Sequence, residues 1–459
     1  MRSRRVVVVG GGITGLSAAL RLREGLGPDA VITVVDQAAR PGGKLRTEPL
    51  SGGYLESGAE SFLVTDPAAV DLATRVGLGD ALRHPVTGRA ALAIGGELRP
   101  IPTGTLMGVP ADLSSVAHVA GPVAEAGSDG RPLLAPGADV AVGALVRARL
   151  GDRVLDRLVD PLLGGVYAGR GDDLSLAATV PALAAACRVE FTLTGAVRAA
   201  LAQRASASPP TALAQRTATP VFATVDGGMS RLVAATAAAS GAELRLGAPV
   251  RALERVADGW RVGVGDTVFD ADGVVLAIPA RPAARLLAGV SADAAAEVGV
   301  LDYASVALVA LAVRGARLPE LSGFLVPASE GYAVKALTIF TTKWGHLGRP
   351  DGLALLRASV GRYGDAAALR RTDDALVALV HAELGKLLGH PLPAPDSARV
   401  TRWGGGLPQY APGHLDRVAR ARSALDGLPL ALAGAAYDGV GIPACVRSGT
   451  AAAERLLGS

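Results

Sequence analysis

The chain has 459 residues, 50% of them hydrophobic and 19% charged, which excludes a disordered chain or a fibrous repeat and leaves room for about three domain-sized units. The net charge of +4 comes from 46 basic and 42 acidic residues, and because the arginines are scattered singly, nucleic acid is not expected as a partner. No apolar run approaches the roughly 18 residues of a membrane-spanning helix.

The two cysteines, Cys187 and Cys445, have neither disulfide nor metal-site spacing. This usage is typical of a reducing compartment and disfavours structural zinc or an iron–sulfur cluster. The basic N-terminus is followed by only four valines before three glycines, which is too short for the apolar region of a signal peptide. We therefore predict a cytoplasmic protein that holds no metal.

The first fifty residues predict a dinucleotide-binding unit. Arg5–Val9 has the pattern of a buried parallel strand, because its four successive valines show no alternation. Residues 10–15 have the GxGxxG spacing and open a helix with an apolar face. A second strand, Val31–Val35, ends at Asp36, about 20 residues beyond the last glycine, where a carboxylate binds ribose hydroxyls.

The three glycines of this motif have separate tasks. Gly10 permits the tight turn, Gly12 lets a pyrophosphate approach the backbone at the positive end of the helix, and Gly15 allows close contact between helix and strand. A GxGxxG spacing arises by chance in a chain with 59 glycines. The prediction therefore rests on the complete strand, glycine, helix, strand and acid unit.

Three further segments favour a flavin dinucleotide over a nicotinamide one. Residues 40–47 form a basic, glycine-containing turn that can hold the extended pyrophosphate of a flavin. Residues 244–279 predict a β-hairpin followed by a buried strand that ends at a proline. Residues 429–434 predict another buried strand, and the glycine-rich residues 438–449 open a closing helix whose start can meet the flavin.

The intervening chain predicts helices first and a sheet later. Residues 69–221 have a helical character, and residues 141–158 show apolar side chains every three to four positions. Residues 205–219, rich in Ala, Ser, Pro and Thr, predict a mobile connector. Residues 306–313 predict a buried strand and residues 373–388 a helix.

With these signatures in order, the chain resembles the FAD-dependent amine oxidase and porphyrinogen oxidase superfamily. Within it, the likeness is to the bacterial coproporphyrinogen III oxidase and protoporphyrinogen oxidase family. The Gly-Val-Tyr-Ala-Gly and Pro-Gln-Tyr segments are the most particular to that family. The narrower likeness is carried by residues 56–63, 101–110, 160–169, 174–176 and 403–414.

The resemblance implies an α/β fold with a discontinuous Rossmann-like FAD-binding domain, an antiparallel-sheet substrate domain and a helical domain. The FAD-binding domain is expected from residues 1–68, 222–290 and 425–459. Residues 69–221 are assigned to the helical domain and residues 291–424 to the substrate domain.

The resemblance also implies FAD as the cofactor. Glu60 falls where the family has an acidic residue near the flavin, with a helix-capping or surface carboxylate as the alternative. Trp403 corresponds to an aromatic residue near the flavin, with core packing as the alternative. Contacts with the cofactor are expected from Gly10, Gly11, Gly12, Ile13, Thr14, Gly15, Asp36, Gly42, Gly43, Lys44, Gly58, Ala59, Glu60, Ser61, Val250, Trp403, Gly434, Gly441, Ile442 and Pro443.

For the substrate, the resemblance implies contacts with Gly164, Gly165 and Tyr167, whose segment lines the porphyrin cavity in the family. Glycine carbonyls could there face pyrrole N–H groups, whereas a tight turn with a packed tyrosine is the alternative. Glu60 and Tyr167 are the candidate catalytic residues. Tyr410 and His414 are weaker candidates, since a lone histidine is more often structural.

The implied reaction oxidises coproporphyrinogen III to coproporphyrin III in three two-electron steps, with O₂ as acceptor and H₂O₂ as product. Protoporphyrinogen IX is the alternative substrate. An amine oxidase or a carotenoid desaturase, and a porphyrin carrier without turnover, remain further alternatives. Peripheral membrane contact and ferrochelatase-type enzymes are candidate partners, and the arginines that bind propionates are not identified by sequence.

Overall fold

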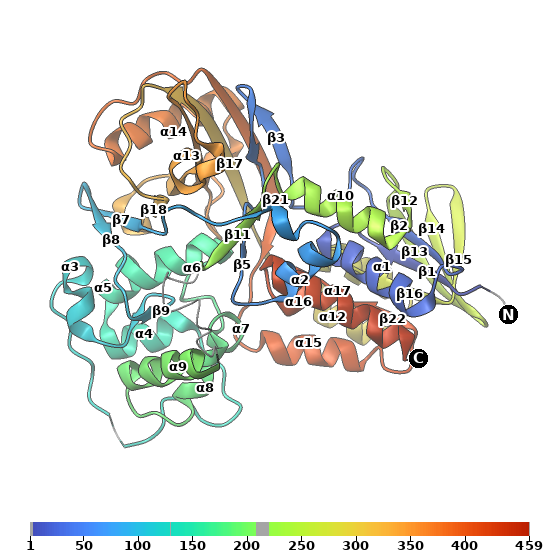
Figure 1. Cartoon of the computed structure of the whole chain (residues 1–459). Helices are drawn as coiled ribbons and strands as arrows, with labels where there is room; N and C mark the ends of the chain where they lie inside the picture. Colours follow the sequence, from blue (N-terminus) through green and yellow to red (C-terminus); the bar gives the residue numbers. More distant parts are fainter. Residues whose placement is uncertain (1–2, 129, 208–219, 459) are drawn as a thin grey trace.

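The computed structural model describes residues 3–128, 130–207 and 220–458. A five-stranded parallel sheet forms the centre of one half of the molecule (Figure 1), in the order β12-β2-β1-β16-β22. Three stretches of chain that are far apart in sequence therefore build one sheet. Its strands are β1 (Arg5–Val9), β2 (Val31–Val35), β12 (Glu243–Arg245), β16 (Gly273–Leu276) and β22 (Leu430–Leu432).

Both faces of this sheet are covered, which is why the strand sequences lack alternation. Val6 and Val8 pack against the helices on one face, whereas Val7 and Val9 pack on the opposite face against a second, three-stranded sheet and further helices. The first face is covered by α1 (Ile13–Leu26), α2 (Ala68–Arg75), α10 (Met229–Ser240) and α17 (Ile442–Leu457). The second carries β13 (Val250–Val256), β14 (Gly259–Val264), β15 (Thr267–Ala271), α11 (Ala280–Leu287), α12 (Ala292–Gly299) and α15 (His414–Ser423).

A seven-stranded sheet dominates the other half, in the order β21-β17-β20-β19-β18-β7-β8. Neighbouring strands are antiparallel except for the parallel pair β18 and β7. Helix α14 (Asp373–Leu387) covers one face, and α13 (Phe340–Lys343) follows β19. The strands are β7 (Ala90–Ile94), β8 (Glu97–Pro100), β17 (Tyr303–Arg314), β18 (Gly323–Leu325), β19 (Val334–Ile339), β20 (Leu353–Val360) and β21 (Ser397–Pro408).

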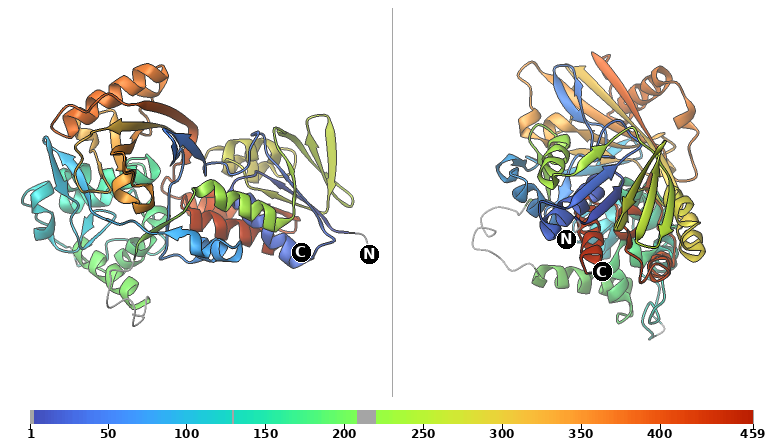
Figure 2. Two further views of the ribbon diagram at one scale, coloured as in Figure 1. Left: turned by 45° about the horizontal axis from the view of Figure 1, so that its top comes forward. Right: turned by 90° about the vertical axis from the view of Figure 1, so that its right-hand side faces the viewer.

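A cluster of helices lies beside this sheet, with its own apolar core (Figure 1). In the left-hand view of Figure 2, this cluster and the seven-stranded sheet occupy one end of the molecule, and the β13–β15 sheet projects at the other. The elements of the cluster are α3 (Ala117–Ala120), α4 (Val142–Leu150), α5 (Asp152–Val154), a π-helical turn (Leu155–Val159), α6 (Asp160–Tyr167), α7 (Leu176–Thr179), α8 (Pro181–Cys187) and α9 (Leu193–Ala207).

Several short strands and one short helix complete the fold. Antiparallel pairing joins β3 to β4, β9 to β10, and β11 to both β5 and β6. These elements are β3 (Thr47–Leu50), β4 (Gly53–Glu56), β5 (Phe62–Leu63), β6 (Leu82–Arg83), β9 (Thr105–Leu106), β10 (Val109–Pro110), β11 (Phe222–Val225) and α16 (Ala435–Asp438). Single 3₁₀ turns occupy Gly79–Ala81, Leu113–Val116, Ala328–Glu330, Gly345–Leu347 and Ala368–Arg370.

The predicted strand–helix–strand unit, the hairpin, the long strand at 303–314 and the helix at 373–387 are confirmed. The helical prediction for residues 69–221 is wrong between 82 and 110, where β6–β10 form and β7 and β8 join the seven-stranded sheet. Ala90–Ile94 is a short apolar run, and such runs carry no periodicity that separates a strand from a helix.

The helical character predicted for residues 141–158 is confirmed, but the stretch is divided among α4, α5 and a π-helical turn. Gly151 has φ +83°, which ends α4 and starts α5 in a new direction. Of the expected connector at 205–219, residues 205–207 belong to α9, and residues 208–219 lie outside the described part of the chain. Within the described residues, no helix combines the length and the apolar character needed to cross a membrane.

Candidate active site

The glycine-rich turn between β1 and α1 has the geometry expected of a phosphate-binding loop. A Cβ atom on Gly15 would lie 1.9 Å from the Gly10 carbonyl oxygen, so only glycine fits there. A Cβ on Gly12 would meet nothing within 4 Å. The backbone at Gly12 therefore faces open space, as a closely approaching ligand requires.

Asp36, at the end of β2, holds this turn in place. Its carboxylate accepts hydrogen bonds from the backbone N–H groups of Gly11 and Ala38, both at 2.7 Å. Each oxygen uses one lone pair in these bonds and keeps another for a ligand hydroxyl. The predicted ribose contact is compatible with this geometry and stays a prediction.

Two helix N-termini present free backbone donors. Neither Gly12, before α1, nor Gly441, before α17, supplies a side-chain cap, and neither helix has an acidic residue in its first turn. Such ends attract anions through their unpaired N–H groups and the helix dipole. Ile442 and Pro443 form the buried first turn of α17, and Gly434 lies on an adjacent loop with φ +123°.

The basic turn at residues 40–47 lies directly against the glycine-rich loop. Gly42 donates its N–H to the Gly11 carbonyl at 2.7 Å, and Gly42 pairs with Gly12 in an isolated bridge. The Lys44 ammonium has no hydrogen bond or ion pair with any described residue, and its burial lowers its pKa. A desolvated cation without a counter-ion fits an anionic ligand.

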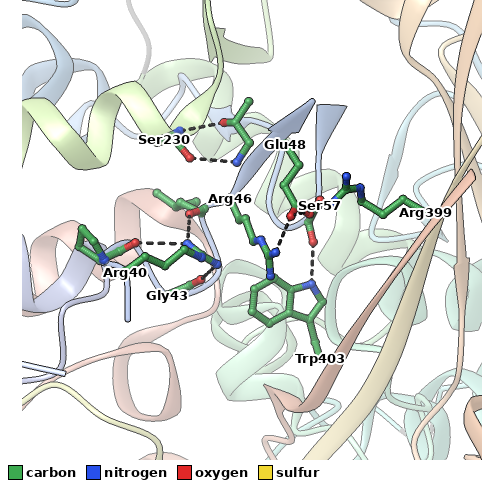
Figure 3. Close-up of polar contacts among 11 residues, drawn as sticks. Arg40, Gly43, Arg46, Glu48, Ser57, Ser230, Arg399 and Trp403 are labelled. Carbon is green, nitrogen blue, oxygen red and sulfur yellow. Dashed lines mark hydrogen bonds and ion pairs between the residues drawn. The ribbon is translucent and has the colours of Figure 1, made fainter. Parts of the chain in front are cut away.

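The segment 56–61 continues this path toward the seven-stranded sheet. A Cβ on Gly58 would lie 1.8 Å from the Lys44 carbonyl oxygen and 3.4 Å from the Trp403 ring, and Ala59 donates its N–H to the same carbonyl at 3.0 Å. The Trp403 indole N–H donates to the Ser57 carbonyl at 2.7 Å (Figure 3). Residues separated by more than 340 positions thus meet at one place.

A charged network supports this segment from behind (Figure 3). Glu48 accepts hydrogen bonds from the Ser57 hydroxyl and from Arg46, and Arg399 of β21 lies 3.1 Å from its carboxylate. Burial opposes ionisation of Glu48, but these three donors outweigh it and lower its pKa. The network ties β3 to β21 and fixes the position of Ser57.

Glu60 forms the centre of a buried ion cluster. Its carboxylate lies 2.5 Å from Lys343 Nζ and 2.6 Å from an Arg357 guanidinium nitrogen. Burial opposes ionisation, but the two cations together lower the pKa of Glu60, so it is ionised at neutral pH. Arg357 also donates to the carbonyl of Gly58 at 2.8 Å. The one carboxylate and two cations give the cluster a net charge of about +1. Glu60 is therefore not the surface carboxylate considered as the alternative.

Glu56, four residues earlier, is in the opposite electrostatic state. It is 3% exposed, and burial raises its pKa to about 7. One carboxyl oxygen accepts hydrogen bonds from the Thr47 hydroxyl and the Met229 N–H, both at 2.9 Å, whereas the other is buried without a hydrogen-bond partner among the described residues. Glu56 is therefore about half protonated at pH 7 and largely protonated below it.

The predicted substrate segment forms the last turns of α6. Gly164 is half-buried, Gly165 is exposed, and the Gly164 carbonyl accepts a hydrogen bond from Lys335 Nζ of β19 at 3.0 Å. Tyr167 points into the helical core, where its ring packs edge-on against Tyr410 at 5.6 Å between centroids. Burial raises the pKa of Tyr167 to about 12, so its phenol keeps its proton at neutral pH.

Tyr410 and His414 have structural environments. The Tyr410 hydroxyl donates to the Ala435 carbonyl, and its ring lies 4.4 Å from that of His414. Burial lowers the pKa of His414 to about 4, so this histidine is neutral. In the described part of the chain, no group of three or more potential metal ligands comes together.

A cavity of about 320 Å³ lies elsewhere, between α15, α17 and β22. Arg422, Arg447 and Arg455 line it, and they are ion-paired with Asp438, Asp66 and Asp426 respectively. Because its cations already have partners, this cavity carries no ligand assignment here.

The structure brings together the predicted residues of the glycine-rich loop, Lys44, the 58–61 segment and Trp403. Val250, at the start of β13, packs against the apolar cluster that includes Val9 and Val35 at the ends of β1 and β2. Sequence reasoning missed Lys335, Lys343 and Arg357. The sequence has only four lysines among 46 basic residues, and two of them stand in the apolar stretch 333–344, which is a signal that could have been used.

The chain is similar in sequence to a known protein family. Residues 13–457 match the family described as flavin containing amine oxidoreductase. The chain belongs to this flavin-containing amine oxidoreductase family. The match covers nearly the whole chain, so the flavin amine oxidase-like α/β fold with its mixed sheets extends over both halves of the molecule.

Individual members of the family are similar over their full length. The coproporphyrinogen III oxidase of Mycobacterium leprae is 39% identical, with 99% of each chain covered. Human protoporphyrinogen oxidase is 30% identical, also with 99% of each chain covered. A solved structure from Exiguobacterium sp. 255-15, which carries a provisional protoporphyrinogen oxidase name, has a TM-score of 0.84 at 31% identity and covers 100% of this chain and 99% of that one.

Proposed function

We propose that this chain is an FAD-dependent oxidase that converts coproporphyrinogen III to coproporphyrin III, with three O₂ reduced to three H₂O₂ for the six hydrogens removed. The observation that carries the proposal is the 39% identity with the M. leprae coproporphyrinogen III oxidase over 99% of both chains. The site geometry supports a flavin dinucleotide and an apolar macrocycle.

The residues at the glycine-rich end fit the phosphates of FAD. The open space over Gly12, the two uncapped helix N-termini and the unpaired Lys44 ammonium all favour a bound anion. The path from Gly42 through Lys44 and Gly58 to Trp403 supports the position of the flavin ring beside the 58–61 segment. In this proposal the parallel-sheet half is the FAD-binding domain and the seven-stranded sheet belongs to the substrate domain.

An apolar shelf next to the Glu60 cluster suits a porphyrinogen. Leu63 of β5 and Phe222 of β11 are cross-strand partners, and both are exposed. Lys343 Nζ lies 5.3 Å from the centroid of the Phe222 ring, which joins the shelf to the ion cluster. Exposed apolar side chains beside buried charges are typical of a ligand-binding surface.

Bound FAD supplies the hydride acceptor and passes electrons on to O₂. The chain's own contribution is orientation and electrostatics. The net positive Glu60 cluster stabilises negative charge that develops nearby. Glu60 accepts from both of its cations and stays ionised, so it acts through position and charge. The glycines of α6 leave the backbone open to a flat ligand, because no side chain covers them.

Protoporphyrinogen IX remains the second candidate substrate. The observation that keeps it is the 30% identity with the human protoporphyrinogen oxidase over the full length of both chains. Coproporphyrinogen carries four carboxylates and protoporphyrinogen two, so the difference must lie in cations that bind carboxylates. The cytoplasmic location and the contacts with membrane or ferrochelatase-type enzymes stay predictions.

The proposal is tested by mixing the FAD-loaded protein anaerobically with coproporphyrinogen III and, separately, with protoporphyrinogen IX. We expect flavin bleaching to be faster with coproporphyrinogen, followed by peroxide and porphyrin fluorescence when air is admitted. Faster bleaching by protoporphyrinogen would select the second candidate. No bleaching by either compound would refute a porphyrinogen oxidase.

A further inference from the structure

Lys335 is a buried cation that has no counter-ion. It lies on β19 and is 6% exposed. Its ammonium donates to the Gly164 carbonyl at 3.0 Å, and it has no ion pair within 4.0 Å among the described residues. An ammonium has three N–H donors, so two of them are unused. Burying such a group without compensation is expensive.

The charged group that acts on Lys335 is another cation, Arg362. Arg362 donates to the carbonyls of Val326 and Tyr332, at 3.0 and 3.1 Å, and Val326 in turn donates its N–H to the Lys335 carbonyl at 2.9 Å. Burial first, and Arg362 second, lower the pKa of Lys335 to about 7.

The carboxylates of this region compensate Arg362 and leave Lys335 unpaired. Burial lowers the pKa of Arg362, and Asp365, Glu383 of α14 and Asp160 of α6 partly offset this effect, whereas none of them acts on Lys335. Arg362 has no ion pair within 4.0 Å in the described part of the chain. Among the described residues, Lys335 therefore keeps a carbonyl partner only, which favours an external anion.

The route to Lys335 passes over the last turn of α6. Gly164 is half-buried, Gly165 is exposed, and Val166 is an exposed apolar residue. The Gly164 carbonyl that accepts from the ammonium belongs to this partly exposed turn, and neither glycine has a side chain; the Leu325 side chain lies 3.4 Å from where a Cβ on Gly165 would be. A ligand that lies against α6 with an apolar face can bring a carboxylate at its edge toward Lys335.

We propose that Lys335 binds a carboxylate side chain of the substrate, with Arg362 as the supporting cation. This inference rests on the proposed function, since the carboxylates are those of a porphyrinogen. Lys335, and not one of the scattered arginines, would then be a cation that binds a propionate. A propionate oxygen would accept from one or both of the unused N–H donors, in a charge-assisted hydrogen bond.

A proton accompanies this binding step. In the free protein a pKa of about 7 leaves Lys335 half protonated at neutral pH, whereas a bound carboxylate favours the charged form and raises the pKa. Above pH 7, the protein must therefore take up a proton when it binds the ligand. The affinity falls with rising pH, by up to about tenfold per pH unit in this range.

The test uses the FAD-loaded protein and coproporphyrin III, the stable oxidised product, whose binding is followed by absorbance and fluorescence without turnover. The tetra-amide of coproporphyrin III, which has no carboxylate, is the second probe. We compare the wild-type protein with Lys335→Met and with Lys386→Met, a matched change at an exposed lysine of α14. Kd is measured between pH 6 and 9, and proton uptake by calorimetry in buffers of different ionisation enthalpy.

We expect Lys335→Met to raise the Kd for coproporphyrin III by about 10- to 100-fold, to leave the Kd for the tetra-amide within about twofold, and to flatten the pH dependence. KM for coproporphyrinogen III should rise more than kcat falls. Lys386→Met should behave as wild type. The proton uptake of the wild-type protein requires no variant, so it tests the inference even if Lys335→Met does not fold.

An unchanged Kd in Lys335→Met, an equal loss for both probes, or wild-type binding without proton uptake would each overturn the role of Lys335. A wild-type protein that binds coproporphyrin III but oxidises no porphyrinogen would instead refute the proposed function. The two failures are therefore distinguishable.

Discussion

Replacing Glu56 by glutamine should stabilise the protein at alkaline pH. Glu56 has a pKa of about 7 in the folded protein, against an ordinary value of 4.5, because it is buried. Between these two values the folded chain holds a proton that the unfolded chain has lost. Folding stability from this group is therefore complete below about pH 4.5 and is lost as the pH rises through 7.

The magnitude follows from the size of the pKa difference. Each pKa unit corresponds to about 1.36 kcal/mol, so a rise from 4.5 to about 7 costs about 3 kcal/mol once Glu56 is ionised. Between pH 5 and 8.5 the wild-type protein should lose about 2.5 kcal/mol of unfolding free energy through this group. Glutamine stays neutral and keeps the oxygen that accepts from Thr47 and Met229, so Glu56→Gln should lack that loss.

The assay is urea unfolding, followed by tryptophan fluorescence at fixed excess FAD, at several pH values from 5 to 8.5. Glu48→Gln is the control of opposite sign. Its carboxylate has a lowered pKa, so it contributes stability above its unfolded pKa and loses it as the pH falls through the folded value. Glu48→Gln should therefore be destabilised by nearly the same amount throughout this pH range, because its deficit shrinks only below the unfolded pKa. If Glu56→Gln and wild type run parallel at every pH, the neutral buried state of Glu56 is wrong.

The remaining predictions concern the cofactor loop and the ion cluster. Gly12→Val fills space that is empty in the structure, so the apo protein should unfold at the same urea concentration as wild type. FAD at 100 times its Kd should stabilise the wild-type protein by roughly 2.7 kcal/mol and the variant not at all. A variant that is purified yellow, with FAD bound, would contradict this prediction. Gly15→Ala brings a Cβ within 1.9 Å of the Gly10 carbonyl and should lower the unfolding midpoint of the apo protein itself. Glu60→Gln leaves Lys343 and Arg357 without a counter-ion and should cost about 3 to 5 kcal/mol at neutral pH. Since the pKa of Glu60 is lowered, that deficit should narrow as the pH falls below its unfolded value, and thermal unfolding from pH 3 to 7 measures it.

The sequence predicted those elements whose cause is local or periodic. Val6–Val9 could be assigned because a strand buried on both faces needs apolar residues at every position, and the two cores on either side confirm this. Ala90–Ile94 could not be assigned, because it forms a strand by pairing with the segment around Phe324, more than two hundred positions later. The break at Gly151 was visible as a glycine, but nothing local distinguishes a tolerated glycine from one that ends a helix.

The site was predictable to the same extent. The glycine-rich loop is found by spacing, because its function needs the absence of side chains at fixed intervals. Glu60 could be named by resemblance, yet its state could not, because its partners Lys343 and Arg357 lie nearly three hundred positions away. Glu60 and Glu56 are four residues apart in sequence, yet the pKa of Glu60 is lowered and that of Glu56 is raised. This difference comes from the tertiary neighbours of each carboxyl group.

Most of the lysines lie at buried positions next to the proposed ligand sites. In a chain whose basic residues are nearly all arginines, three of four lysines occupy desolvated positions: Lys44 at the glycine-rich loop, Lys343 in the Glu60 cluster and Lys335 behind α6. Arginine holds its proton everywhere, whereas a buried lysine can lose its charge. Lys343 has a fixed carboxylate partner in Glu60. Among the described residues, Lys44 and Lys335 lack such a partner, and burial lowers the pKa of each, so a bound anion would favour their charged forms. Affinity at these two positions is thereby coupled to the anionic groups of the ligand, phosphate at one end and carboxylate at the other.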